Sequence, residues 1–297
     1  MSLTSHLKSP DSPIGDFIKQ RFAHTAILTK PANQQLKRST TLRPVWTPGM
    51  AYPYGPVGEA IDYRIRYAFA LTPYWQFVAW QGAKLLPYPP QLRRAFFERL
   101  HATLQTIQPV GKRLAVEEER ILARYCYVLS LFEEVFRSSS ALHGPLLNPA
   151  PRQSVDELLA LPPEPCIDDL CNLFALFYDR YQHLLSLPHT LNPTFAGSID
   201  IGGADADFIV DGCLIDSKTS ITPRLSADHL RQLAGYLLLD YHDAFHIMSL
   251  GIYMARQGML FTWSVEEFLQ QLTGEANVSL PALRQTFQQL CRSYGTL

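Results

Sequence analysis

Four charged residues of types that could bind a metal ion stand close together in the chain. Asp205 and Asp207 precede a short apolar run, and Asp216 and Lys218 end the next one. Carboxylate oxygens are the ligands that hard divalent cations such as Mg²⁺ prefer. Three acids and one ammonium within fourteen residues therefore indicate metal-ion chemistry, provided that the fold brings the four side chains together.

The sequence between these charges predicts a β-hairpin. Two apolar runs, Phe208–Val210 and Cys213–Ile215, flank the pair Asp211–Gly212. An Asp-Gly pair in this setting favours a type I′ turn, because both central residues of that turn need positive φ. Counting outward from the turn predicts six facing pairs: Val210 with Cys213, Ile209 with Leu214, Phe208 with Ile215, Asp207 with Asp216, Ala206 with Ser217, and Asp205 with Lys218.

Side chains alternate between the two faces of a strand, so the hairpin would place all four charged side chains on one face. Like charges directly opposite each other destabilise a sheet, whereas a bound divalent cation reverses the sign of that interaction. Asp205 and Asp207 both qualify as the first acid. We favour Asp207 because it is predicted opposite Asp216, while Asp205 could hold Lys218 or a second ion.

The segments that must position this hairpin also have clear patterns. Alternating apolar residues predict strands over Phe195–Ile201, Phe245–Tyr253 and Met259–Trp263. Ser226 is a good N-cap for a helix over Ala227–Asp240. Together these elements predict an α/β core with a mixed central sheet flanked by helices.

The remainder of the chain is predicted to be largely helical. Pro56 opens a helix over Val57–Leu71, and Lys30–Tyr54 has the composition of an extended loop. A chain of 297 residues suits one core with a large insertion. We therefore predict an N-terminal arm over 1–55, a core made of 56–73 and 190–297, and a helical lobe over 74–189 inserted in that core.

This order of elements resembles the PD-(D/E)XK nuclease superfamily, with a restriction-endonuclease-like core, and in particular its RecB-like exonuclease branch. The resemblance rests on Asp207, on Asp216-Ser217-Lys218, and on Gln232 and Tyr236, which match a Q-x-x-x-Y signature on the following helix. A weaker trace is Gly58–Asp62 on the first core helix. The chain departs from the family pattern at Ala206, because the Pro of the PD dipeptide is missing.

The resemblance implies a metal-dependent nuclease that hydrolyses phosphodiester bonds, with DNA as the expected partner, in repair, recombination or defence against foreign DNA. It implies that Mg²⁺ or Mn²⁺ is held by Asp207, Asp216 and the backbone carbonyl of Ser217, with Asp62 as a further candidate ligand. Lys218 would orient or deprotonate the attacking water. The residues expected to position the phosphate or contact the nucleic-acid backbone are Gln232, Tyr236, Arg224, Arg231, Arg64 and Arg66.

Composition sets further limits. The net charge of −1 argues against a protein coated with basic surface, although a local nucleic-acid groove is compatible with it. The five cysteines are odd in number and form no C-x-x-C pair, which favours reduced thiols in a cytoplasmic protein. The first eight residues have no apolar signal core, and no apolar run reaches membrane-spanning length. We expect a cytoplasmic protein without a membrane partner; a protein partner or a homo-oligomer stays open.

Other interpretations of the same residues stay open. The core could be a catalytically degenerate module that binds nucleic acid or protein on the same fold, or an unrelated α/β protein with a coincidental hairpin. Asp62 is also explained as a helix acid paired with Arg66 four residues later. Gln232 and Tyr236 are also explained as ordinary helix residues. The sequence does not distinguish DNA from RNA, single from double strands, or endonuclease from exonuclease.

Overall fold

The computed structural model describes residues 2–46, 49, 51–138, 144–148 and 150–295. The predicted arm, lobe and core therefore each include positions outside the described residues, namely 1, 47, 48 and 50, then 139–143 and 149, then 296–297. The chain divides into two compact units. The first consists of Met1–Thr41, Leu187–Lys218 and Thr222–Leu297, and the second of Leu42–Ser186 and Thr219–Ile221.

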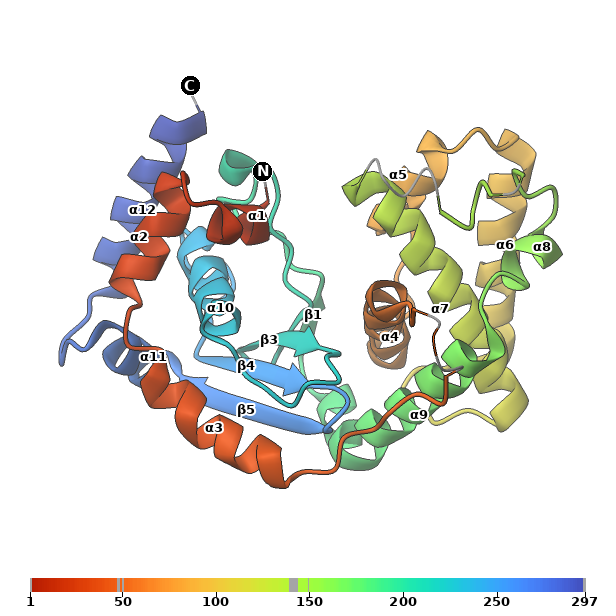
Figure 1. Ribbon diagram of the computed structural model, residues 1–297. Coiled ribbons are helices and arrows are strands. Elements are labelled where there is room, and N and C mark those ends of the chain that lie inside the picture. The colour runs from red at the N-terminus through yellow and green to blue at the C-terminus, as the bar shows by residue number, and fades with distance from the viewer. Residues whose placement is uncertain (1, 47–48, 50, 139–143, 149, 296–297) are drawn as a thin grey trace. The chain divides into compact units, whose positions relative to one another are not determined.

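The first unit contains a five-stranded mixed sheet in the order β1-β2-β3-β4-β5 (Figure 1). Its strands are β1 (His189–Leu191), β2 (Phe208–Val210), β3 (Cys213–Lys218), β4 (Ser249–Met254) and β5 (Met259–Ser264). Neighbouring strands are antiparallel except β3 and β4, which are parallel. A parallel pair needs a crossover connection, and helix α10 (Ala227–Leu239) lies in that connection. The predicted α/β class with a mixed sheet is thus confirmed.

Helices pack around this sheet to form one apolar core. They are α1 (Leu3–Lys8), α2 (Pro13–Arg21), α3 (Ala26–Arg38), α10, α11 (Val265–Thr273) and α12 (Leu280–Gly295), with a 3-10 turn at Ile199–Ile201. Helix α10 contacts β4 and lies beside α1, α2 and α12, whereas α11 contacts β4, β5 and α3 (Figure 1). The hydrophobic effect of this burial holds β3, which carries Asp216 and Lys218, in one core with β4 and α10.

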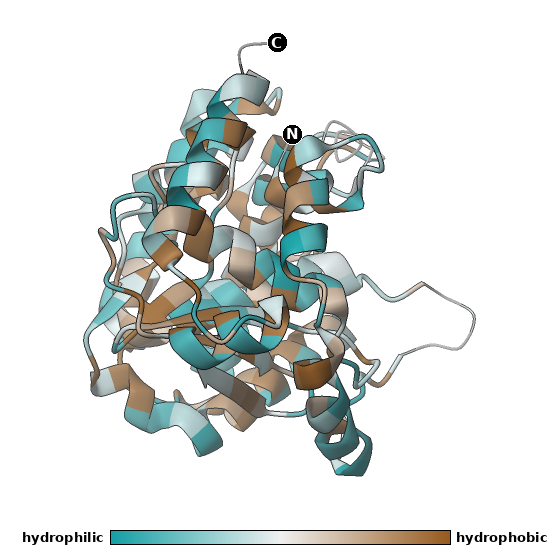
Figure 2. Cartoon of the chain, turned by 90° about the vertical axis from the view of Figure 1, so that its left-hand side faces the viewer, coloured by the Kyte–Doolittle hydropathy of each residue, from teal (hydrophilic) through white to brown (hydrophobic). Residues whose placement is uncertain are grey.

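The outer helices are amphipathic. The helix nearest the C-terminus in Figure 2 alternates between hydrophilic and hydrophobic residues. This is α12, in which Leu283, Phe287 and Cys291 recur every four residues and are buried. Residues at that spacing share one helical face, so α12 has one face in the core of the first unit.

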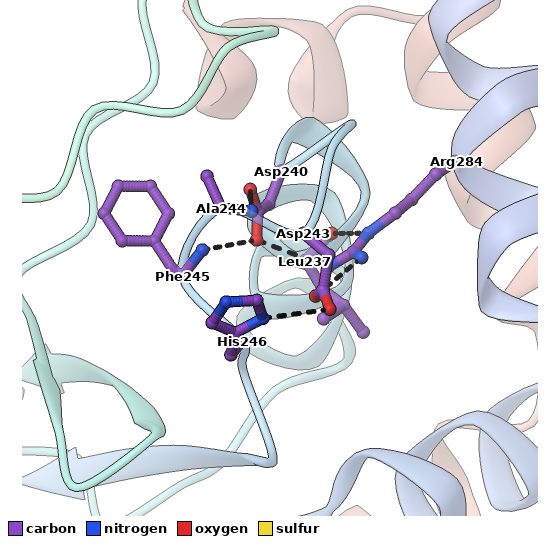
Figure 3. A network of polar contacts seen from close by, with 7 residues as sticks. All are labelled: Leu237, Asp240, Asp243, Ala244, Phe245, His246 and Arg284. Atoms are coloured by element: carbon purple, nitrogen blue, oxygen red, sulfur yellow. Dashed lines mark hydrogen bonds and ion pairs between the residues drawn. The ribbon is translucent and has the colours of Figure 1, made fainter.

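A buried polar network fixes the end of α10 to α12. Arg284 of α12 donates from Nε to the carbonyl of Leu237 (3.1 Å) and from Nη1 to Asp243 (2.8 Å), and its Nη2 lies 3.4 Å from Asp240 Oδ2 (Figure 3). The carboxylate of Asp240 also accepts from the backbone N–H groups of Ala244 (2.9 Å) and Phe245 (3.3 Å). This network positions the connection between α10 and β4.

The second unit consists of helices joined by turns and loops, and its described residues contain no strand. Its helices are α4 (Tyr54–Phe69), α5 (Val78–Leu85), α6 (Pro90–Ile107), α7 (Val116–Arg137), α8 (Val155–Leu159) and α9 (Glu164–Tyr181), with 3-10 turns at Tyr74–Gln76 and Gln182–Ser186. Helices α4 and α5 pack mainly on α7. Arg64 of α4 is buried, makes a bidentate ion pair with Glu119 of α7 (2.5 and 2.8 Å), and lies over the ring of Phe174.

Two predicted elements are wrong. The strand expected at Phe195–Ile201 is absent, because Ile199–Ile201 forms a 3-10 turn and the first strand is β1. Ser198 Oγ accepts from the Phe195 N–H (3.1 Å) and donates to the Ala204 carbonyl (2.6 Å), and such local bonds compete with strand pairing. The loop expected over Lys30–Tyr54 is instead helical as far as Arg38.

Two segments, residues 1–41 and helix α4, belong to other compact units than the predicted domain boundaries implied. Residues 1–41, most of the predicted arm, belong to the first unit, where Leu3, Ile18 and Leu36 are buried in its core. Helix α4, which the prediction placed in the core with 190–297, belongs to the second unit. Both segments are amphipathic helices, and the sequence pattern of such a helix does not say which core receives its apolar face.

None of the helices in the described part of the chain combines the length and the apolar sequence that a bilayer crossing requires.

Candidate active site

The turn of the predicted hairpin is confirmed. Asp211 and Gly212 both have positive φ, at 49° and 72°, as a type I′ turn requires. The three inner pairs have the predicted register, from Val210 with Cys213 to Phe208 with Ile215. The ladder between β2 and β3 ends there, so the three outer pairs, which contain the acids, are not ladder pairs.

Asp207 reaches β3 through its side chain. Its Oδ2 accepts a hydrogen bond from the backbone N–H of Ser217 (2.6 Å), while its carbonyl accepts from the N–H of Asn192 on the other side (2.9 Å). The Asp207 carboxylate bound in this way is close enough for its negative charge to raise the pKa of Asp216. The sequence thus predicted the proximity of the two acids correctly, but it did not foresee the hydrogen bond that produces it.

Asp216 and Lys218 form an ion pair on one face of β3. Asp216 is 3% exposed, and its Oδ2 lies 2.6 Å from Lys218 Nζ. Among the described residues this buried Oδ2 has the ion pair but no hydrogen bond of good geometry. Burial raises the pKa of Asp216 to about 6; the positive charge of Lys218 opposes this shift and the negative charge of Asp207 adds to it.

Helix α10 adds Gln232 and Tyr236 to the same set of contacts. Lys218 Nζ donates to Gln232 Oε1 (2.9 Å), and Gln232 Nε2 donates to the hydroxyl of Tyr236 (2.7 Å). Burial raises the pKa of Tyr236, and the charges of Asp216 and Asp207 raise it further. The predicted catalytic residues therefore lie together in the structure, in one connected group.

Two further residues border this group, and the sequence analysis did not single them out. Thr4 of α1 places its Oγ1 3.4 Å from Gln232 Nε2. His229 lies one turn before Gln232 on α10; burial lowers its pKa to about 4, and the charge of Lys218 contributes. The spacing of His229 from Gln232 could have identified it, whereas Thr4 joins the site only through the packing of α1 on α10.

The predicted backbone-contacting arginines have different surroundings. Arg224 is exposed in the segment before α10, and Arg231 is part-buried on α10 with its Nη1 3.3 Å from Asp228. Arg66 lies on α4 with its guanidinium 5.2 Å from the Tyr63 ring centre, and Asp62 is buried on the same helix. Since α4 belongs to the second unit, the roles of Asp62, Arg64 and Arg66 at this site stay predictions.

The donor set suits a hard divalent cation held by few protein ligands. The described residues contain no group of three or more His, Cys, Asp or Glu side chains arranged around a common point. Mg²⁺ in proteins is commonly bound through one or two carboxylates and keeps several waters. Asp207 and Asp216 supply two carboxylates, and the buried Oδ2 of Asp216 would gain from a cation. The residues present therefore fit Mg²⁺ or Mn²⁺.

In comparisons with family models, curated proteins and solved structures, nothing matches this chain. The functional argument accordingly rests on the residues of the chain and their geometry.

Proposed function

We propose that the first unit is a metal-dependent nuclease of the PD-(D/E)XK type that hydrolyses phosphodiester bonds, with DNA as the expected substrate. One observation carries the proposal: Asp216, Lys218, Gln232 and Tyr236 form a continuous chain of contacts, and Asp207 is hydrogen-bonded to the residue between Asp216 and Lys218. Metal-dependent phosphodiester hydrolysis needs acids that bind the metal ion and a lysine that acts on water or phosphate. This group contains two acids, a lysine and a glutamine.

The arrangement of elements supports the same proposal. An antiparallel hairpin of β2 and β3 is followed by helix α10 and by β4, which is parallel to β3. This is the order in which the superfamily presents its two acids, its lysine and its helical glutamine. Asp216 and Lys218 are on the face of β3 that meets α10, since Lys218 contacts Gln232.

Each side chain has a definite task in the proposed reaction. Asp207, Asp216 and the carbonyl of Ser217 would hold Mg²⁺ or Mn²⁺, which when bound lowers the pKa of water and offsets negative charge on the phosphate. Lys218 is held between Asp216 and Gln232, where its ammonium can orient water or balance phosphate charge. Tyr236 accepts from Gln232 and thereby fixes the amide that orients Lys218.

A second candidate function is a degenerate module that binds nucleic acid without cleaving it. The observation that favours it is the ion pair between Lys218 and Asp216, because a lysine that neutralises the acid could replace the metal ion.

The two candidates differ in DNA cleavage. The purified protein would be incubated with linear, nicked and single-stranded DNA in Mg²⁺, in Mn²⁺ and in EDTA, beside Asp216→Asn, Lys218→Ala and the control Glu267→Gln. Glu267 is an exposed acid in the first turn of α11, outside the proposed site, so its loss should leave cleavage unchanged. Cleavage that needs metal and is lost in both site variants supports the nuclease. Cleavage that survives in Asp216→Asn contradicts it, and DNA binding without cleavage supports the degenerate module.

A further inference from the structure

His229 shares a face of α10 with the residues of the proposed site. It lies three residues before Gln232 and seven before Tyr236, a spacing that places the three side chains in one stripe along a helix. Gln232 and Tyr236 of this stripe have contacts that connect them to Lys218. The ring of His229 is only part-buried, so it continues the stripe toward the accessible start of the helix.

One nitrogen of the His229 ring takes part in the cap of α10. Its Nδ1 accepts a hydrogen bond from the backbone N–H of Ser226 (3.3 Å), and the N–H of His229 in turn donates to Ser226 Oγ (3.3 Å). A ring nitrogen that accepts from an N–H carries no proton, so in the neutral ring the proton is on Nε2. With this reciprocal cap in place, the ring of His229 has one polar group without a partner among the described residues, a neutral N–H donor.

The start of α10 has a fixed position, which makes this donor a preorganised one. Asn33 of α3 donates from Nδ2 to the carbonyl of Leu225 (2.9 Å), and its Oδ1 accepts from the N–H of Leu225 (2.7 Å). The side chain of Asn33 therefore binds both the backbone N–H and the carbonyl of Leu225, the residue before the N-cap Ser226. Burial and the charge of Lys218 lower the pKa of His229 to about 4, which keeps the ring neutral at pH 7.

We propose that His229 is a substrate-binding residue that donates from a neutral Nε2–H to a phosphate oxygen of the nucleic acid. This inference rests on the proposed function, because the phosphate is the group that Lys218 is placed to attract. A second cation beside Lys218 would be repelled by it, whereas a neutral donor adds a hydrogen bond to the phosphate without that repulsion.

Three substitutions separate this role from the capping role. His229→Gln and His229→Glu both keep the helix cap, because Gln and Glu are the usual partners of Ser in a capping box. Gln also keeps a neutral donor, Glu replaces the donor with a negative acceptor, and His229→Leu supplies neither charge nor donor. Affinity for a fluorescent DNA oligonucleotide would be measured in Ca²⁺, together with KM for cleavage in Mg²⁺ and the thermal midpoint of each variant.

The expected result is that His229→Gln binds within about threefold of the unchanged protein, whereas His229→Glu and His229→Leu bind at least about tenfold more weakly. Equal binding by all three variants overturns the proposal. So does weak binding by His229→Glu alone, which would show charge repulsion, or losses that follow the thermal midpoint, which would show a structural role. If the unchanged protein cleaves no DNA, the proposed function fails first; if it cleaves and the variants behave alike, only this inference fails.

Discussion

Two carboxylates are buried in the first unit, and they differ in how well their charge is satisfied. Asp240, at the end of α10, accepts from two backbone N–H groups and lies beside Arg284 (Figure 3). Asp216, on β3, has an ion pair with Lys218 at 2.6 Å, and among the described residues its buried Oδ2 has no further partner and no hydrogen bond of good geometry. The proposed nuclease accounts for the difference: groups of the fold satisfy Asp240, whereas Asp216 would bind the metal ion.

The second unit has a counterpart to Asp240. There, Arg64 and Glu119 are both buried, and two hydrogen bonds join the guanidinium to the two carboxylate oxygens. A bidentate pair uses both oxygens of the acid, so it leaves little for a ligand. The carboxylates of Asp240 and Glu119 thus each have protein partners at both oxygens, as expected for residues that stabilise the fold. Asp216 differs from both, because in the described part of the chain its buried Oδ2 has only the ion pair with Lys218.

The largest expected effect separates the two aspartates by activity. Asp216→Asn should lower the cleavage rate by about 10²- to 10³-fold, because it weakens the hold on the metal ion that would offset the charge developing on the phosphate. Its thermal midpoint should stay equal or rise, because the substitution removes a buried charge. Asp240→Asn should give the reverse pattern, with a lower midpoint and an unchanged rate per folded molecule. Equal cleavage rates for Asp216→Asn and Asp240→Asn would contradict the assignment of a catalytic role to Asp216 and a structural role to Asp240.

Breaking the structural network should have a large effect on stability. Arg284→Met keeps the apolar stem but leaves Asp240 as a buried acid without its cation, which costs about 3–5 kcal/mol of unfolding free energy. Urea unfolding measures this loss. Arg292→Met on the exposed side of α12 is the control, with an expected change within about 0.5 kcal/mol. A stable Arg284→Met variant would mean that the network does not fix α10 to α12.

The pH dependence of stability tests Asp216 by itself. The folded pKa of about 6 lies above the ordinary value of 3.8, so between these values the folded state binds more protons than the unfolded state. The contribution of Asp216 to stability therefore falls as pH rises through this window and is constant above it. In EDTA, the stability advantage of Asp216→Asn should grow by about 2 kcal/mol from pH 4 to pH 7. A difference that is flat with pH would contradict the raised pKa.

The smallest expected effect comes from the hydroxyl of Tyr236. Tyr236→Phe removes the acceptor for Gln232 Nε2 and keeps the ring that stacks on Phe195. The loss of one hydrogen bond is worth about 1 kcal/mol, or about fivefold in cleavage rate. Thr4→Ala, which removes the longer 3.4 Å contact to the same amide, should change the rate by less. A larger loss of cleavage rate in Thr4→Ala than in Tyr236→Phe would contradict this ranking of the two contacts to Gln232.

Local signals predicted the centre of the site well. The Asp211–Gly212 pair determines a turn by its backbone preferences alone, and the turn sets the register of the pairs next to it. The helix that carries Gln232 and Tyr236 has its cap at Ser226, as predicted. These features depend on residues within a few positions of each other, so the sequence contains the necessary information.

The parts that could not be predicted depend on contacts between distant residues. Asp207 approaches Asp216 through a hydrogen bond to Ser217 after the ladder has ended, which no count of register anticipates. Thr4 reaches Gln232 because Leu3 packs against Gly235, where a side chain on the glycine would meet the leucine at 2.8 Å. Segment 195–201 has alternating apolar residues, but Ser198 bonds to its own neighbours and prevents a strand there.

Calorimetric titration of Mn²⁺ into the protein at pH 7.5 tests most directly whether Asp216 binds a divalent metal ion. The unchanged protein and Asp240→Asn should bind Mn²⁺ with saturable heat, and Asp216→Asn should show none. Equal heats for the unchanged protein and Asp216→Asn, or no heat from a folded unchanged protein, would contradict this assignment.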